Sequence, residues 1–140
     1  MKTQNTLGKC RNGSPLTLSI KHPVIAQYTP VYEIRSKILK AVLDTAILKE
    51  MSHVGIASAP AIIELFAKKY SIYVSAGTIY PTFKRIESMG FIEKIPRSGT
   101  RLYTITNTGN TKLKNIQQNI EMLEAFLVSI ICENSGGKEN

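Results

Sequence analysis

The segment between Ser75 and Arg85 carries side chains that suit binding to a polyanion. Small hydroxyl groups can hydrogen-bond to the phosphates or bases of a nucleic acid, and Lys84 and Arg85 can neutralise phosphates or contact guanine. Gly77 has no side chain that would obstruct a close approach of the main chain. The candidate contact residues here are Ser75, Gly77, Thr78, Tyr80, Pro81, Thr82, Lys84 and Arg85.

The distribution of charge also indicates a polyanionic partner. The 140-residue chain has a net charge of +8, and the segments 1–33, 34–74 and 75–105 each carry +3, whereas 106–140 carries −1. A basic domain of this size is typical of proteins that bind nucleic acid or an anionic membrane surface. The last segment contributes nothing to a basic face, so we expect it to have a different role.

Residues suited to catalysis or metal binding are scarce. His22 and His53 each lack a nearby acid or cysteine. Cys10 and Cys132 lie near opposite ends of the chain, which fits neither a disulfide framework nor a zinc site. The sequence has no paired carboxylates and no phosphate-binding glycine loop. We therefore expect no enzyme activity, no cofactor and no metal.

The sequence also lacks membrane and export signals. No apolar run approaches the roughly 18 residues of a transmembrane helix. The segment from Met1 to Cys10 has no apolar region of the kind found in a signal peptide. The expected location is the cytoplasm, with no membrane partner.

Hydrophobic periodicity predicts a mainly α fold with a small β-hairpin. Helices are expected over 34–51, 58–69 and 76–89, with a short extended piece near Gly55. Strands at 91–95 and 101–105 flank a turn, and a long helix covers 108–132. Three helices followed by a hairpin form a winged helix-turn-helix, whose second motif helix enters the DNA major groove. Here the recognition helix would be 76–89.

Arg97 and Arg101 flank the turn of the predicted hairpin and are expected to contact phosphates at the tip of the wing. Each of these assignments has a simpler alternative, because turns and helix surfaces are polar in most proteins. Lys84 and Arg85 could form a solvated face. Ser75 could serve as an N-cap alone, and Tyr80 could pack beneath the helix.

The last predicted helix carries a regular apolar stripe. Its members step by three and four residues, as in a heptad repeat, and its second half is apolar on more than one face. We expect it to form a homodimer, although the stripe could instead pack only on the first helix of the same chain. The expected dimerisation residues are Leu113, Ile116, Ile120, Leu123, Phe126, Leu127 and Ile130.

The predicted organisation has four parts. Residues 1–33 form a partly disordered N-terminal arm, 34–105 the winged-helix DNA-binding domain, 106–132 the dimerisation helix and 133–140 a flexible tail. The basic residues of the arm could extend along a DNA duplex. A small-molecule effector of unknown identity could bind between the terminal helices and the DNA-binding domain.

The stretch from Val74 to Ile92 (VSAGTIYPTFKRIESMGFI) resembles the signature of the PadR-like transcriptional regulators at their recognition helix. The similarity continues through Arg101 to Gly109 (RLYTITNTG). The sequence departs from the family pattern at Ala57-Ser-Ala-Pro60, where the family often has His-Gly-Tyr-Glu, and in its longer arm.

The resemblance implies a homodimeric winged-helix repressor that binds double-stranded DNA through the recognition helix and wing. A dimer of this kind would recognise an inverted-repeat operator. The alternative is a winged-helix module that binds another protein and not specific DNA, because a fold alone does not determine function.

Overall fold

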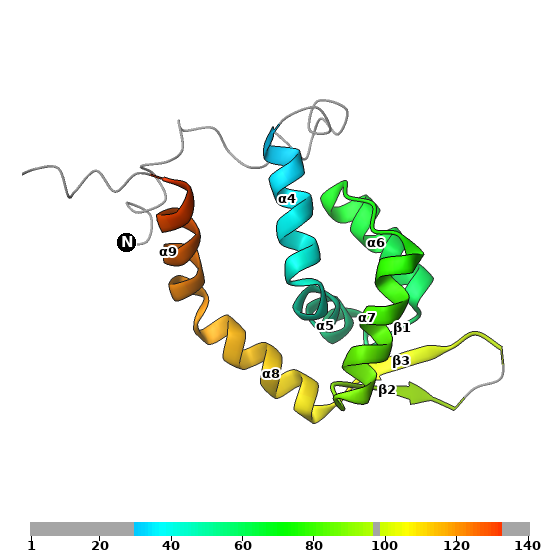
Figure 1. Cartoon of the computed structure of the whole chain (residues 1–140). Helices are drawn as coiled ribbons and strands as arrows, with labels where there is room; N and C mark the ends of the chain where they lie inside the picture. The colour runs from blue at the N-terminus through cyan, green and yellow to red at the C-terminus, as the bar shows by residue number, and fades with distance from the viewer. Residues whose placement is uncertain (1–29, 97–98, 133–140) are drawn as a thin grey trace, which may run out of the picture.

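The computed structural model describes residues 30–96 and 99–132. The elements in chain order are α4 (Pro30–Ala41), α5 (Leu43–Val54), β1 (Ile56–Ala57), α6 (Ala59–Tyr70), α7 (Ala76–Ser88), β2 (Ile92–Ile95), β3 (Leu102–Ile105), α8 (Asn107–Gln118) and α9 (Ile120–Ile131) (Figure 1). The predicted fold class, mainly α with a hairpin wing, is confirmed. The predictions for residues 1–29, Arg97 and the tail 133–140 lie outside the described residues.

The sheet contains one strand more than the predicted hairpin. β2 and β3 pair with Ile92 opposite Ile105, as a hairpin requires. β1 joins the other edge of β3, with Ile56 opposite Thr104, so the antiparallel order is β1-β3-β2. The sequence indicated an extended piece here but not its pairing, because two residues are too few to show an alternating pattern.

The core lies where α5, α6 and α7 pack together and onto the sheet. α7 contributes Ile79, Phe83 and Ile86, whose spacing places them on one side of the helix. The ring of Phe83 meets that of Tyr103 on β3 edge to face, with centroids 5.2 Å apart. The other large side chains that are fully buried are Ile47, Leu48, Met51, Ile62, Phe66, Val74 and Ile92.

The predicted first helix is two helices, and it begins earlier than expected. The structure places Pro30 at the start of α4, whereas residues 1–33 were expected to form the arm. A proline is tolerated in the first turn because that turn needs no N–H donor there. The chain then turns at Val42 (φ −113°, ψ 31°), which separates α4 from α5. Backbone hydrogen bonds from Val42 to Ile38 and from Ala46 to Val42 continue across the turn.

The predicted long C-terminal helix is also interrupted. Asn119 (φ −110°, ψ 22°) separates α8 from α9, and its side-chain amide donates to the carbonyl of Asn115 at 2.8 Å. An asparagine side chain that bonds to nearby main chain offers the backbone an alternative to the helical hydrogen bond. The apolar stripe crosses Asn119 without a change of spacing, so the hydrophobic pattern gave no sign of this break.

Cys132, at the end of α9, is disulfide-bonded, which the spacing of the cysteines did not predict. Within residues 30–96 and 99–132, every helix is too short or too polar to cross a lipid bilayer. The same residues hold no cluster of potential metal ligands.

A buried carboxylate joins α5 to α6. Glu50 is only 2% exposed and accepts hydrogen bonds from Lys69 at 3.0 Å, Tyr70 Oη at 2.8 Å and Lys49 at 3.1 Å. Burial alone would raise the pKa of Glu50, but the hydrogen bonds from Lys69, Tyr70 and Lys49 outweigh it, and the net pKa lies below the ordinary value. The ionised form of Glu50 therefore stabilises the folded chain.

We expect Glu50→Gln to lower the free energy of unfolding at pH 7 by about 1.5–3 kcal/mol, because it removes hydrogen bonds to a charged acceptor. A carboxyl group whose pKa is lower in the folded than in the unfolded chain stabilises the folded chain fully at pH values above its pKa in the unfolded chain. This stabilisation is lost as the pH falls through its pKa in the folded chain. Urea denaturation at pH 7 and at progressively lower pH should show the wild-type advantage shrinking with acid. The exposed Glu64→Gln is the matched control and should change stability little. If the free energies of unfolding of wild type and Glu50→Gln differ by the same amount at every pH, this account is contradicted.

Candidate nucleic-acid interface

The start of α7 leaves main-chain donors facing outward. Ser75 is the extended N-cap residue, and its carbonyl accepts hydrogen bonds from the N–H groups of Thr78 and Ile79 at 3.0 Å. The Ser75 hydroxyl lies 3.3 Å from the hydroxyl of Thr78 and does not cap the helix. The N–H groups of Ala76 and Gly77 precede the first helical hydrogen bonds, so they can bind an anion such as a phosphate.

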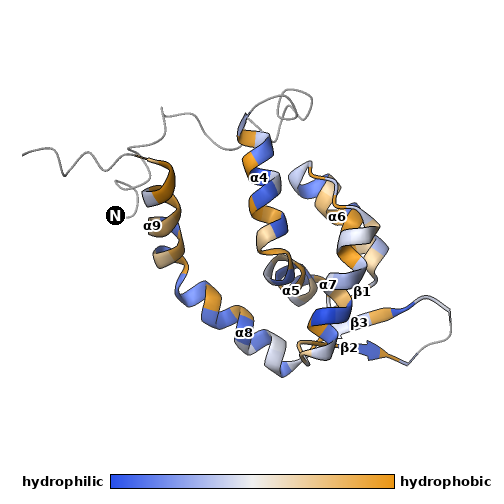
Figure 2. Cartoon of the chain, in the orientation of Figure 1, coloured by the Kyte–Doolittle hydropathy of each residue, from blue (hydrophilic) through white to orange (hydrophobic). Residues whose placement is uncertain are grey.

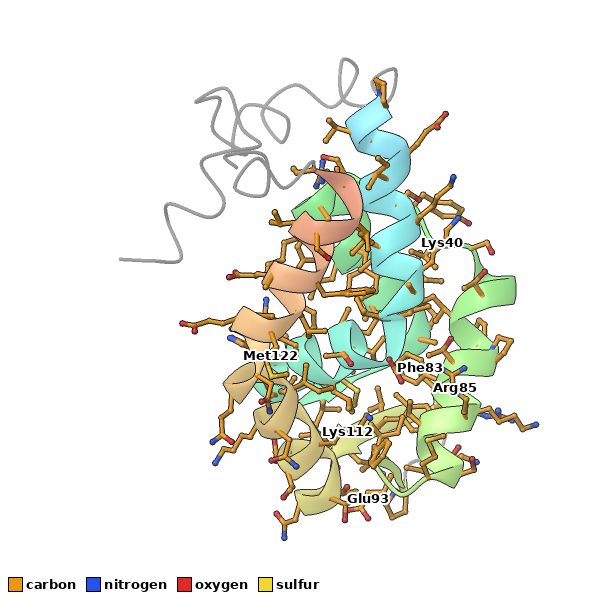
Figure 3. All side chains as sticks on the ribbon, turned by 60° about the vertical axis from the view of Figure 1, so that its left-hand side comes forward. Lys40, Phe83, Arg85, Glu93, Lys112 and Met122 are labelled. Atoms are coloured by element: carbon orange, nitrogen blue, oxygen red, sulfur yellow. The ribbon has the colours of Figure 1, made fainter. Side chains whose placement is uncertain are left out.

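The two sides of α7 differ sharply. The core side is apolar, and Figure 3 shows Phe83 on the side of α7 that faces the other elements. Of the predicted contact residues, Thr78 is half-buried. The exposed ones on this helix and its N-cap are Ser75, Gly77, Tyr80, Pro81, Lys84 and Arg85. Tyr80 therefore does not pack beneath the helix, which was the alternative for it.

The prediction that Thr82 faces outward is wrong. Thr82 is 5% exposed, and its hydroxyl donates to the carbonyl of Thr78 at 2.9 Å. Thr82 lies three residues after Ile79 and so shares the core side of the helix. Because the hydroxyl finds an acceptor on its own helix, burying it leaves no unpaired polar group. Thr82 therefore supports packing and is not part of the exposed face.

A groove of about 720 Å³ separates α7 from the wing. Helix α7 contributes Tyr80, Pro81, Phe83, Lys84 and Glu87 to its walls. The remaining lining residues come from the wing and the start of α6: Lys94, Thr100, Arg101, Tyr103, Ala59 and Pro60. Three exposed cations, Lys84, Lys94 and Arg101, thus surround one groove beside α7.

One of these cations, Lys94, was not predicted from the sequence. It lies on β2 directly opposite Tyr103 of β3, so both side chains share one face of the sheet. The signal was present in the alternation of the strand, because Lys94 follows the core residue Ile92 by two positions. Cations of the wing were instead expected only around its turn, at Arg97 and Arg101.

Arg85 lies apart from this groove. Its guanidinium pairs with Asp44 of α5, with Nη2 and Oδ2 3.8 Å apart, and its side chain is 50% exposed. Figure 3 marks Arg85 and Phe83 on the side of α7 toward α5. An exposed ion pair of this length is weak, so the guanidinium remains available to another anion. The groove brings together Tyr80, Pro81, Lys84 and Arg101, but not Arg85.

Thr106 and Gly109 hold the wing against the end of α7. Gly90 (φ 80°) ends α7, and its carbonyl accepts from the hydroxyl of Thr106 at 2.5 Å. The same hydroxyl caps α8 by accepting from the N–H of Gly109 at 3.1 Å. A Cβ on Gly109 would overlap the carbonyl oxygen of Phe91 and the side chain of Ile105. This close approach explains why Thr106 and Gly109 occur together, three residues apart.

We expect Gly109→Ala to destabilise the fold by about 1–3 kcal/mol, since the new methyl group meets main chain that must shift. Thermal unfolding followed by circular dichroism will measure the destabilisation. Thr111→Ala is the control on the same helix, and we expect its effect to stay within about 0.5 kcal/mol because Thr111 is exposed. Equal melting temperatures for Gly109→Ala and wild type would disprove the steric argument.

The predicted dimerisation residues divide into two groups. Leu113 is 4% exposed and packs within its own chain, where α8 lies against α5, so its assignment to a dimer interface is wrong. Ile116 is half-buried beside it. The residues on α9 face solvent in this chain: Ile120, Leu123, Phe126, Leu127 and Ile130. The alternative, that the whole stripe packs on the chain's own first helix, therefore holds only for its beginning.

No protein-family model matches the sequence, and no curated protein is a detectable relative. Solved structures do match. A PadR family transcriptional regulator from Eggerthella lenta aligns with a TM-score of 0.62 at 20% identity, over 74% of this chain and 94% of the other. A transcriptional regulator from Clostridium thermocellum gives 0.61 at 22% identity, over 69% and 97%. A PadR-like transcriptional regulator from Bacillus cereus gives 0.57 at 24% identity, over 71% and 100%. The resemblance read from the sequence is thus confirmed for the fold: this chain folds like the PadR-like transcriptional regulators.

Proposed function

We propose that this protein is a transcriptional regulator that binds specific double-stranded DNA as a homodimer and represses transcription from an inverted-repeat operator. The observation that carries the proposal is the basic groove beside α7. Lys84, Lys94 and Arg101 surround it, next to a helix start whose main-chain donors face outward. The fold shared with known transcriptional regulators supports the same conclusion.

The recognition surface divides into parts with different tasks. The N-terminal turn of α7, with Ser75, Gly77 and Thr78, would enter the major groove, where short side chains permit a close approach. Tyr80 and Pro81 would lie against base edges. Lys84, with the wing cations, would hold a phosphate strand in the groove. This division assigns specificity to the helix start and affinity to the cations.

The dimer proposal depends on α9. None of its residues is buried, although its sequence, IEMLEAFLVSII, is almost entirely apolar. In Figure 2 most of α9 has the colour of hydrophobic residues, and the helix stands apart from α5, α6 and α7. Exposed apolar patches of this kind mark protein interaction sites. The exposed apolar residues Val31, Ile34 and Ile38 of α4, with Val42 directly after it, offer a complementary surface on a second copy.

A homodimer would place two recognition helices in successive major grooves, about 34 Å apart. The operator would then be an inverted repeat. We propose that the protein needs no cofactor or metal, is not an enzyme, and acts in the cytoplasm. A small-molecule effector, if one binds, has a place in the groove of about 310 Å³ between α5 and α8, which Val42, Ala46, Leu113 and Ile120 line.

We expect Lys84→Ala and Arg101→Ala to weaken DNA binding and to reduce the slope of log affinity against log salt by about 1 for each phosphate that the variant no longer neutralises. Binding to the DNA upstream of the protein's own gene, measured by fluorescence anisotropy at several salt concentrations, tests this. Lys68→Ala is the matched control, because Lys68 pairs with Glu64 on α6 and does not line the groove. Unchanged binding by both groove variants would show that DNA does not occupy the groove and would favour the protein-binding module.

We expect Phe126→Glu to convert the dimer to a monomer, because the substitution places a charge in the apolar face of α9. Sedimentation equilibrium at micromolar concentration will give the mass of each species. Gln118→Glu adds the same charge on the exposed surface of α8 and should leave the dimer intact. The proposed interface is wrong if Phe126→Glu has the dimer mass.

A further inference from the structure

Helix α7 breaks a rule of helix formation at one position. Pro81 is the sixth residue of the helix that begins at Ala76, past the first turn in which proline is tolerated. A proline there has no N–H to donate to the carbonyl four residues earlier, and its ring crowds that carbonyl. The carbonyl in question belongs to Gly77. Departures from local rules that the fold does not require are expected at functional sites.

Two nearby carbonyls have hydrogen-bond donors. That of Ser75 accepts the N–H groups of Thr78 and Ile79, and that of Thr78 accepts the hydroxyl of Thr82. Pro81 therefore leaves the Gly77 carbonyl as an acceptor without its helical donor. Water can reach it, so the fold is not strongly destabilised, but an unpaired acceptor is created on this surface.

The chain around this carbonyl lies at the surface of the molecule. Gly77 and Pro81 are both exposed. A Cβ placed on Gly77 would meet one atom, Ser75 Oγ, and only at 3.8 Å, so no other side chain covers the main chain in that direction. Pro81 also lines the basic groove with Tyr80 and Lys84. The acceptor is thus on the part of α7 that would face DNA.

We propose that the Gly77 carbonyl, released from the helix by Pro81, accepts a hydrogen bond from a base amino group in the major groove. The donors of that kind are N6 of adenine and N4 of cytosine, whereas guanine and thymine present only acceptors and a methyl group there. Pro81 is then a specificity-determining residue that acts through the main chain. This inference rests on the proposed DNA-binding function and extends it.

The chemistry of the surface makes such an acceptor useful. Lys84, Lys94 and Arg101 are donors without acceptor capacity, and the free N–H groups at the helix start are donors as well. Hydroxyl groups can play either part, so they discriminate weakly between bases. A main-chain carbonyl is an acceptor only, and its position is fixed by the helix. The carbonyl therefore favours a base that presents an amino group. A base that presents an acceptor at the same position finds no donor there.

The test is Pro81→Ala, which restores the N–H group that pairs with the Gly77 carbonyl. Selection of bound sequences from a random DNA pool should show the wild type preferring adenine or cytosine at one position of each half-site. Pro81→Ala should lose this preference, with discrimination falling by between about twofold and tenfold, the range for one neutral hydrogen bond. Its melting temperature should equal or exceed that of the wild type, since alanine favours the helix. Damage to the fold would therefore not explain the altered preference.

Pro60→Ala is the matched control. Pro60 lines the same groove, but it lies in the first turn of α6, where its missing N–H leaves no helical carbonyl without a donor. We expect Pro60→Ala to keep the base preference of the wild type. Loss of the preference in both variants would assign it to proline ring contacts and would overturn the inference.

Base analogues locate the contact. Replacing the preferred adenine by purine, or the preferred cytosine by pyrimidin-2-one, removes only the amino group. Affinity should fall by between about twofold and tenfold for the wild type and stay constant for Pro81→Ala. An unchanged preference in Pro81→Ala would overturn the inference while the DNA-binding function stands. If the wild type selects no sequence at all, the proposed function itself fails. Complete loss of DNA binding by Pro81→Ala would also overturn the inference, because phosphate contacts do not depend on this carbonyl.

Discussion

The burial of one side of α7 determines how the rest of the molecule is arranged. Ile79, Phe83 and Ile86 are almost fully enclosed by α5, α6 and the sheet, and this contact fixes the rotation of the helix about its axis. Once that rotation is fixed, Tyr80, Pro81 and Lys84 must face the wing, and the N-terminal turn must face solvent. The hydrogen bonds of Glu50 hold α6 against α5, and those of Thr106 hold the wing at the other end of α7. The core behind the exposed face therefore sets its orientation.

Most of the architecture could be predicted from local sequence signals. Helices α6 and α7, the N-cap at Ser58, the glycine at position 90 and the hairpin all follow from hydrophobic spacing and from residues with a strong conformational preference. The breaks at Val42 and Asn119 could not be predicted in this way. The spacing of apolar residues is the same on both sides of each break, and the turn at Val42 retains its backbone hydrogen bonds. Hydrophobic periodicity is therefore the same for a continuous helix and for an interrupted one.

The candidate site was less predictable than the fold, because it depends on which neighbour each side chain meets. Thr82 was assigned to the surface by residue type, but a hydroxyl can bond to its own helix and be buried at little cost. Lys94 was overlooked because a charged residue in a short strand looks solvated until its cross-strand partner is known. Leu113 belongs to the same stripe as the exposed residues of α9, and only the contact of α8 with α5 separates it from them.

Because the chain breaks at Asn119, α8 connects the wing to α9 as a separate helix. The first turn of α8 packs against the wing at Gly109, and the end of α8 at Asn119 determines the direction of α9. Each residue inserted into or deleted from α8 would rotate α9 by about 100° about the axis of α8 and shift it by about 1.5 Å relative to α7. A change in the length of α8 would therefore reorient the exposed apolar residues of α9 without altering any residue that lines the groove.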